Sequence, residues 1–319
     1  MNGSYVLRGA RLASALVTAL GLVLALCSAG PAGAQASASD AAGLSICTSA
    51  RHPALAARIS SGILAALRGR SSAVGIAVDD RVTGVNCRLH PHWHIDSASV
   101  VKVTILAALL RKLQEEHKSL TAAQRELATQ MITVSDNNAA STLWAETGRP
   151  SLQRFLNLAG MHETSLGPGG YWGLTQITAH DELTLLQLLT SKNPVLTLAS
   201  RNYVLNLMAR VIASERWGVP AGAPTDLTVH VKNGWLPQPT GGWRINSIGS
   251  FSGHGRDYMI VVLTWDNPTM AYGVDTVQAV AEVINRALNP GATALIPPSA
   301  PQPSWGTPDE QIPAPPARL

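Results

Sequence analysis

Strand-like segments at both ends of this 319-residue sequence enclose a long helical middle, and this arrangement limits the possible folds more than any other feature. Alternating apolar residues predict strands at 73–80, 81–89, 226–234, 243–251 and 257–265. Helical periodicity predicts terminal helices at 53–68 and 274–288. The terminal helices can then pack on one face of a single antiparallel sheet formed by both sets of strands. We therefore expect an α+β fold: an antiparallel sheet flanked by the terminal helices, plus an all-helical subdomain inserted at about 115–220.

The helical middle contains several segments with apolar residues at helical spacing. One helix is predicted to run from just after Lys102 to about Gln114, and another spans 120–134, beginning near Thr121. Further helical segments are AASTLWAE, SLQRFLNLAG, 179–190 and 204–213.

The N-terminus has the features of a secretory signal peptide. Arg8 and Arg11 precede an apolar run at 12–26, and an A-x-A exit follows at 32–34. The run is shorter than the roughly 20 residues that a membrane span needs. An uncleaved anchor is the alternative, and lipoprotein processing at Cys27 is disfavoured by the bulky Leu26 before it. We expect removal of residues 1–36, a secreted or extracytoplasmic protein, a folded domain at 37–288, and no stable membrane span after cleavage.

Cleavage would leave two of the three cysteines, Cys47 and Cys87. Two cysteines in an exported protein favour a disulfide. We expect this bond to tie the N-terminal helix to the sheet; the alternative is a pair of unpaired buried thiols.

The C-terminal segment and the charge balance indicate little specific binding. Nine of the 20 prolines lie between Asn289 and the end of the chain, which predicts a disordered tail at 289–319. The formal net charge of +4 comes without a lysine-rich run. We therefore expect no nucleic-acid partner.

The stretch DSASVVK places a serine and a lysine three residues apart at the start of a helix. Ser99 and Lys102 would share one helix face. The surrounding valines would desolvate Lys102 and lower its pKa, so that a neutral amine could act as general base toward Ser99. The alternative is a lysine that extends its ammonium group to solvent.

A second motif, SDN, lies between two predicted helices. Ser135 could relay a proton to a leaving group, and the amide of Asn137 could hold substrate. The alternative is helix capping, which favours the same residue types and suits Asp136 in particular.

A third motif, VKNG, lies on a predicted strand. Lys232 could supply positive charge beside the nucleophile, and Gly234 would let substrate approach the strand. The N–H of Trp235 could form an oxyanion hole with the N–H of Ser99. The alternative is an edge-strand lysine followed by an NG turn.

In this order the motifs match the set S-x-x-K, S-D-N and K-T-G, and the chain resembles the active-site-serine penicillin-recognising proteins, most closely the class A β-lactamases. The resemblance covers roughly residues 45–288. It implies a serine hydrolase that forms an acyl-enzyme on Ser99, with no cofactor and no metal. It also implies a small β-lactam or a peptidoglycan peptide as substrate, and we expect a monomer.

Two departures from the family pattern concern substrate binding and deacylation. Asn233 replaces the threonine of K-T-G, although its amide could still donate to a substrate carboxylate. The family's deacylating glutamate would fall near Gly170, but no acid occurs between Glu163 and Asp181. We interpret Glu163, Asp181 and Glu182 as solvated charges rather than substitutes. The residues expected for acylation are therefore present, whereas the base expected for deacylation is missing.

Several other residues have functional and structural interpretations. The three histidines of HPHWH, which are His90, His92 and His94, could bind a metal from one face of a strand. No nearby acid supports this, so we expect a solvated strand. His230 would share a strand face with Lys232. Arg244 could pair with a substrate carboxylate or be an exposed arginine, and Tyr171 and Trp172 could form a pocket wall or a surface lid.

The leading hypothesis is a secreted hydrolase that opens β-lactams or related amides and esters through Ser99. A D-Ala peptidase or esterase of the cell wall on the same fold is one alternative. The other is a binding protein, in which Ser99 traps a β-lactam with negligible turnover.

Overall fold

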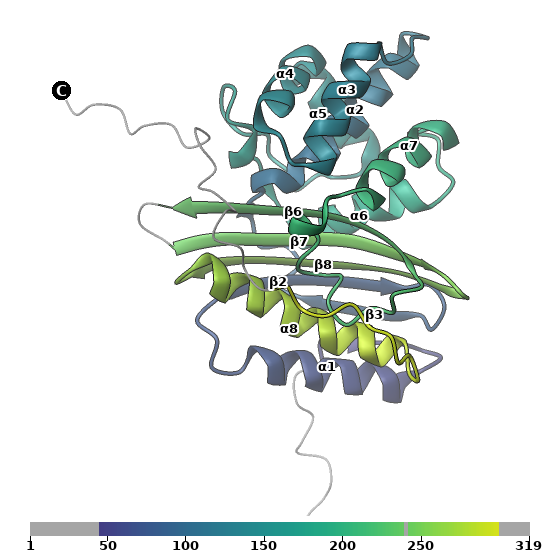
Figure 1. Cartoon of the computed structure of the whole chain (residues 1–319), viewed down its shortest axis with the longest axis vertical. Helices are drawn as coiled ribbons and strands as arrows, with labels where there is room; N and C mark the ends of the chain where they lie inside the picture. Colours follow the sequence, from purple (N-terminus) through teal and green to yellow (C-terminus); the bar gives the residue numbers. More distant parts are fainter. Residues whose placement is uncertain (1–44, 239–241, 300–319) are drawn as a thin grey trace, which may run out of the picture. The chain divides into compact units, whose positions relative to one another are not determined.

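The computed structural model describes residues 45–238 and 242–299, in which a central sheet separates two helical layers (Figure 1). The signal peptide expected at 1–36 and the part of the tail from residue 300 lie outside the described residues. None of the described helices is long and apolar enough to cross a bilayer.

The sheet is antiparallel throughout and has the strand order β1-β3-β2-β8-β7-β6. Its strands are β1 (Cys47–Thr48), β2 (Ala73–Asp80), β3 (Val85–Leu89), β6 (Thr228–Gln238), β7 (Gly242–Gly253) and β8 (Arg256–Asn267). Strand β2 pairs with β8 through the register Ala77↔Val261, so the N-terminal and C-terminal strands meet at the centre of the sheet. A separate two-stranded ribbon joins β4 (Ile95–Asp96) to β5 (Gln176–Ile177). The predicted α+β class is confirmed.

Helices α1 (Pro53–Leu67) and α8 (Met270–Leu288) cover one face of the sheet (Figure 1). Each buries one apolar stripe, which includes Ile59 and Ile63 on α1 and Val277 and Ile284 on α8. These side chains pack with one face of the strands in a single hydrophobic core, as helical spacing requires.

The other layer is built from six helices and three 3-10 turns on the opposite side of the sheet (Figure 1). The helices are α2 (Val101–Glu115), α3 (Ala122–Thr133), α4 (Asn137–Thr147), α5 (Arg149–Ala159), α6 (Ala179–Thr190) and α7 (Leu198–Ala209). The turns are η1 (Ala98–Val100), η2 (Trp172–Leu174) and η3 (Ala213–Glu215). Helix α2 is buried almost all round at its start, so it forms the centre of this layer.

Three predicted elements differ in position from the structure. Strand β3 begins at Val85 because the Asp80 carboxylate accepts from the N–H groups of Val82 and Thr83 and forms a turn. Helix α7 begins at Leu198, not at 204, because the Thr197 hydroxyl caps it. The HPHWH segment is a loop, since β3 ends at Leu89 and His90 has φ of +42°.

The Cys47–Cys87 disulfide is present, but it does not tie the N-terminal helix to the sheet. Both cysteines lie on strands, and they face each other directly in the β1–β3 pair. The bond therefore links two neighbouring strands and encloses α1 and β2 in a covalent loop.

The disorder expected from Asn289 is wrong for residues 289–299. The N–H of Ile296 donates to the Ala223 carbonyl at 2.8 Å, and the Ile296 carbonyl accepts from Gly222 N–H at 2.8 Å. The Ile296 side chain also packs against the core formed with α1 and α8. The hydrogen bonds to Gly222 and Ala223 and the buried apolar contact of Ile296 therefore order this stretch despite its prolines.

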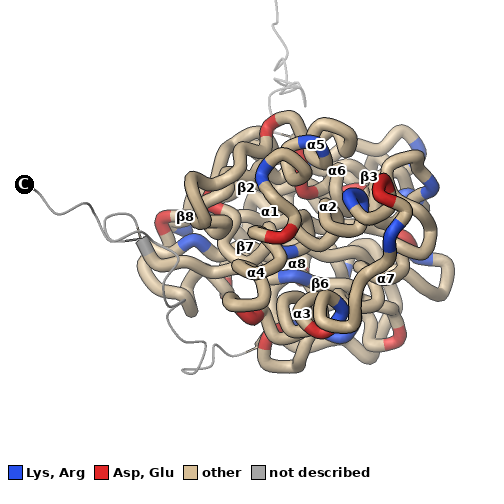
Figure 2. Tube along the Cα trace, turned by 90° about the horizontal axis from the view of Figure 1, so that it is seen from above, with Lys and Arg blue, Asp and Glu red and all other residues tan. Residues whose placement is uncertain are grey.

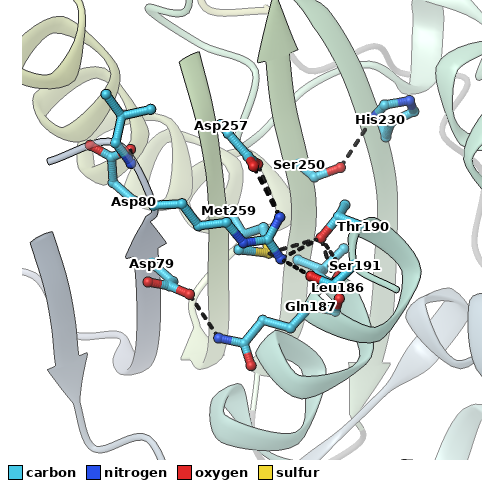
Figure 3. A network of polar contacts seen from close by, with 12 residues as sticks. Asp79, Asp80, Leu186, Gln187, Thr190, Ser191, His230, Ser250, Asp257 and Met259 are labelled. Atoms are coloured by element: carbon cyan, nitrogen blue, oxygen red, sulfur yellow. Dashed lines mark hydrogen bonds and ion pairs between the residues drawn. The ribbon is translucent and has the colours of Figure 1, made fainter. Parts of the chain in front are cut away.

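A polar network ties the end of α6 to the sheet (Figure 3). Arg81 pairs with Asp257 at 3.1 Å and donates to the hydroxyls of Thr190 and Ser191 at 2.8 and 2.7 Å. Gln187 donates to Asp79 at 2.8 Å. Basic and acidic residues are interspersed along the trace (Figure 2), and Arg81–Asp257 is one of several ion pairs, such as Arg111–Glu115 and Arg286–Glu282.

Candidate active site

Ser99 lies in the η1 turn directly before α2, with its side chain partly exposed. The residue before it, Ala98, has φ of +46°, in the left-handed region that residues with a Cβ rarely adopt. Such strain persists only where the surrounding structure enforces it, and it is common at functional sites. The turn therefore presents Ser99 in a conformation that a regular helix start would not give.

Lys102 is fully buried, which excludes an ammonium group that extends to solvent. Its Nζ donates to the Ser135 carbonyl at 2.5 Å and to Asn137 Oδ1 at 2.8 Å, and it lies 3.2 Å from Ser135 Oγ. Burial lowers the pKa of Lys102 well below its ordinary value, and the nearby charge of Lys232 lowers it further. Both effects favour the neutral amine that a general base requires.

Ser135 lies between α3 and α4 with φ of +56°. The next residue, Asp136, caps α4 by accepting from Ala139 N–H at 2.7 Å, so the capping role considered for this motif belongs to Asp136. Asn137 begins α4, and its side-chain oxygen is used by Lys102. The Ser135 hydroxyl remains directed toward the two lysines.

Lys232 is also fully buried and reaches the same hydroxyl from β6. Its Nζ donates to Ser135 Oγ at 2.9 Å and to the Asn233 carbonyl at 2.9 Å. Burial lowers the pKa of Lys232 to about 8, although the carboxylate of Glu215, 4.0 Å away, raises it. Ser135 therefore contacts one lysine Nζ from the helical layer and one from the sheet.

Gly234 brings β6 against the backbone that carries Ser99. A Cβ added at Gly234 would lie 2.8 Å from Ser99 N and 2.9 Å from both Ser97 O and Val100 N. Only glycine permits this approach, so the predicted reason for a glycine here has a structural counterpart. Trp235 follows on the same strand, and its ring packs toward Trp217 at a centroid distance of 6.0 Å.

Two residues expected to bind a substrate carboxylate are engaged elsewhere. The amide nitrogen of Asn233 donates to the carbonyls of Glu215 and Trp217 at 2.7 and 2.9 Å. Arg244 Nε lies 3.3 Å from the Asp96 carboxylate, and the guanidinium is only partly exposed. Asn233 therefore holds the segment that carries Glu215, and Arg244 supports the strand that leads to Ser99.

The loop that lacks the family's glutamate places an aromatic ring over the candidate base. Trp172 is 2% exposed, and its ring centroid lies 4.7 Å from Lys102 Nζ. The indole N–H donates to Ser141 Oγ at 3.1 Å, which fixes the ring. Among residues 45–238 and 242–299, no carboxylate accepts a hydrogen bond from Lys102. A cation–π contact thus covers this side of the lysine.

The interpretation of Asp181 and Glu182 as solvated charges is wrong. Asp181 is buried and accepts from Glu163 N–H and the Thr164 hydroxyl at 2.9 and 2.7 Å. Glu182 is fully buried, and neither carboxylate oxygen has a hydrogen-bond partner among the described residues. Burial raises the pKa of Glu182 to about 8, and the charge of Asp181 raises it further. The periodicity of α6 makes both positions inward-facing.

Glu215 is the site residue that the sequence motifs did not reveal. It ends the η3 turn, its side chain is largely buried, and it is the acid paired with Lys232. It lies 17 residues before Lys232 without a motif around it, so only the fold brings it to the site.

The remaining sequence candidates lie around this centre. His230 shares the face of Lys232 and bonds to Ser250 Oγ at 3.0 Å (Figure 3). His90 stacks on Trp93 at a centroid distance of 3.7 Å. His92 and His94 both contact Glu163, whose proximity the sequence did not predict.

Comparison with known proteins agrees with the family resemblance that the sequence motifs indicate. The model of the beta-lactamase enzyme family matches residues 122–288, more than half of the chain, including Ser135 and Lys232 but not Ser99 and Lys102. No curated protein matches the sequence.

Solved structures share the fold at low sequence identity. A class A β-lactamase from Bacteroides cellulosilyticus has a TM-score of 0.64 and 19% identity over 73% of this chain and 97% of its own. A β-lactamase from Xanthomonas campestris has a TM-score of 0.63 and 20% identity over 74% and 99%. A PBP-A mutant, solved as an acyl-enzyme complex with penicillin G, has a TM-score of 0.62 and 17% identity over 72% and 95%. The chain therefore belongs to the beta-lactamase enzyme family, within the active-site-serine penicillin-recognising superfamily.

Proposed function

We propose that this protein is a serine hydrolase that forms an acyl-enzyme on Ser99, with Lys102 as general base. The observation that carries the proposal is the pair of fully buried lysines, Lys102 and Lys232, that both contact the Ser135 hydroxyl. Burying two ammonium groups side by side is energetically costly. Such an arrangement is typical of a site where altered lysine pKa values serve a reaction.

In the acylation step, the Ser99 Oγ attacks the carbonyl carbon of an amide or ester, and its proton passes to the neutral Nζ of Lys102. The bond from this carbon to the leaving nitrogen or oxygen then breaks. The leaving atom takes a proton from Ser135 Oγ, which recovers one from Lys102 across their 3.2 Å contact. Lys232 stabilises the hydroxyl of Ser135 and negative charge on the substrate.

The oxyanion would be bound by backbone N–H groups of Ser99 and Trp235. The close approach of Gly234 to Ser99 N supports this, because it brings the two segments together. Asn137 and Lys232 are the side chains best placed for substrate contacts. Asn233 acts as a positioning residue, since its amide donates to the Glu215 carbonyl.

Deacylation needs a water molecule and a base, and one observation favours a long-lived acyl-enzyme. Trp172 covers Lys102 where the family's pattern expects a carboxylate, and this ring can neither accept a proton nor orient water. A second function is therefore an acyl trap or sensor, which reacts once and turns over slowly.

The proposed substrates are β-lactams and related amides or esters, and a D-Ala peptidase or esterase on the same fold is the alternative within the enzyme class. The protein is proposed to act as a monomer, since Ser135, Lys102 and Lys232 of a single chain already contact one another. We also propose export through the signal at 1–36 to an oxidising compartment, which the Cys47–Cys87 bond supports.

The test is intact-protein mass spectrometry over time with penicillin G and with a chromogenic cephalosporin. The wild type is compared with Ser99→Ala, and Ser119→Ala at an exposed position serves as the matched control. We expect an adduct equal to the mass of penicillin G on the wild type and on the control, and none on Ser99→Ala.

The lifetime of the adduct distinguishes the two functions. Decay of the adduct with accumulation of hydrolysed product would identify a hydrolase, and a stable adduct would identify an acyl trap. If no adduct or product depends on Ser99 with either β-lactam, the β-lactam assignment is wrong. Short esters and D-Ala-terminated peptides then test the remaining enzyme function.

A further inference from the structure

Three potential metal ligands that are distant in the sequence converge on the surface of the helical layer. His92 lies in the loop after β3, Glu163 follows α5, and His180 is in the first turn of α6. One ligand atom from each lies within 4.8 Å of the others. His92 Nδ1 is 2.7 Å from Glu163 Oε1, and His180 Nδ1 is 3.9 Å from Glu163 Oε2.

The three segments are also held together by hydrogen bonds that use the backbone groups, not the side chains, of His180 and Glu163. The His180 N–H donates to the Pro91 carbonyl at 2.9 Å. The Glu163 N–H donates to Asp181 Oδ2 at 2.9 Å, and its carbonyl contacts His94 Nε2 at 3.0 Å. The backbone positions of the cluster are therefore fixed before any ion binds, which reduces the entropy lost on binding.

Neighbouring groups also orient the ligands. The Thr178 hydroxyl donates to Glu163 Oε2 at 2.8 Å, and Oε1 lies 2.7 Å from His92 Nδ1, so an ion would replace the direct contact between these two ligand atoms. The Asp181 carboxylate lies 3.3 Å from His180 Nδ1 and helps to orient the imidazole. Contacts of this kind set the tautomer and the orientation of metal-binding histidines.

We propose that His92, Glu163 and His180 form a binding site for a divalent transition-metal ion, with Zn²⁺ as the ion tested. Two imidazoles and one carboxylate are a known zinc donor set that leaves a fourth position open for water. Tetrahedral zinc needs ligand atoms about 3.4 Å apart, given bonds of about 2.1 Å. The cluster needs only small side-chain rotations to reach this, and the His92 and His180 side chains are 61% and 45% exposed.

An ion here would join the two segments that border the candidate active site. The loop with His92 leads through β4 to Ser99, and the segment after Glu163 leads to Trp172 and β5. Strands β4 and β5 already pair through Ile95↔Ile177. Zinc would therefore stabilise this region without contacting the reacting groups, and the proposal does not depend on hydrolase activity.

The experiment is calorimetric titration of the purified protein, without a histidine tag, with ZnCl2. We expect one Zn²⁺ per chain and a loss of affinity on the order of 10-fold or more for His92→Ala, Glu163→Gln and His180→Ala. The matched control is His254→Ala, which removes a side chain that is 68% exposed outside the cluster. Circular dichroism without metal checks that each variant is folded.

A second measurement uses only the wild type, so it does not depend on the folding of variants. Anomalous scattering from a zinc-soaked crystal should place the ion between His92, Glu163 and His180. The proposal is wrong if the ion lies elsewhere, if no binding is detected at millimolar Zn²⁺, or if His254→Ala weakens binding as much as the three cluster variants.

Discussion

The buried carboxyl group of Glu182 should make this protein less stable as the pH rises from about 5 to 8. The side chain is fully buried in α6, and both oxygens lack hydrogen-bond partners among the described residues. Its pKa is about 8 in the folded state, compared with 4.5 as the ordinary value. Between these values the folded state holds a proton that the unfolded state has released, so the free energy of unfolding falls with increasing pH.

The size of this effect follows from the difference in pKa. One pKa unit corresponds to about 1.4 kcal/mol, and pH 7 lies about 2.5 units above the unfolded-state pKa. The wild type should therefore lose about 3 kcal/mol of stability at pH 7 through Glu182 alone, relative to pH 4.5. Glu182→Gln keeps the shape and the buried polar group but cannot ionise. It should match the wild type near pH 4.5 and exceed it by about 3 kcal/mol at pH 7.

Urea unfolding, followed by circular dichroism at a series of pH values, measures this difference directly. The comparison between wild type and Glu182→Gln cancels contributions from other titrating groups, because both proteins share them. Glu126→Gln, at an exposed position on α3, is the matched control and should follow the wild-type curve. Parallel curves for wild type and Glu182→Gln would refute the reasoning, as would a variant that is less stable at pH 7.

Three further predictions concern the site and its support. Trp172→Leu removes a buried cation–π contact worth about 2 kcal/mol, which favours the charged form of Lys102. The pKa of this lysine should therefore fall further, and the acidic limb of the acylation rate should move to lower pH in Trp172→Leu and by less in Trp172→Phe. An unchanged limb in Trp172→Leu would contradict this. Gly234→Ala places a Cβ 2.8 Å from Ser99 N and should slow adduct formation about 100-fold, as followed by mass spectrometry. Gly170→Ala is the control, because no atom lies within 4 Å of its new Cβ, and it should leave the rate of adduct formation unchanged. Cys87→Ser removes the disulfide that closes a loop with a sequence separation of 40, and it should lower the free energy of unfolding by about 4 kcal/mol in urea denaturation. Equal stability of the variant and the oxidised wild type would show that the disulfide does not stabilise the fold.

The main features of the fold and the motif residues were predictable because they depend on local patterns. Alternation and helical spacing located the strands and the terminal helices, and the spacing of Ser99 and Lys102 predicted a helix start, where the structure has Ser99 in η1 and Lys102 in the first turn of α2. The SDN and VKNG motifs likewise identified Ser135 and Lys232 as candidates, and the structure places these two side chains in contact. Each of these assignments needs only the local conformation and the order of elements along the chain.

The contacts that the sequence did not reveal all join distant segments. Glu215 reaches Lys232 only because η3 lies beside β6, and Glu163 reaches His92 across 71 positions. The direction of the Asn233 amide depends on carbonyl groups of a loop whose path no motif encodes. Glu182 was misinterpreted because an acidic side chain at a helix start is usually solvated, and here the helix turns it into the core.

The two edges of the sheet differ in a way that affects aggregation. At one edge, β1 is only two residues long and is covalently attached to β3. At the other, β6 is 11 residues long and carries the backbone beside Ser99. An edge strand presents unpaired backbone groups to which another extended chain can add. A ligand lying along β6 would compete with a neighbouring molecule for these groups, so occupancy of the candidate active site should also protect the protein from intermolecular strand pairing.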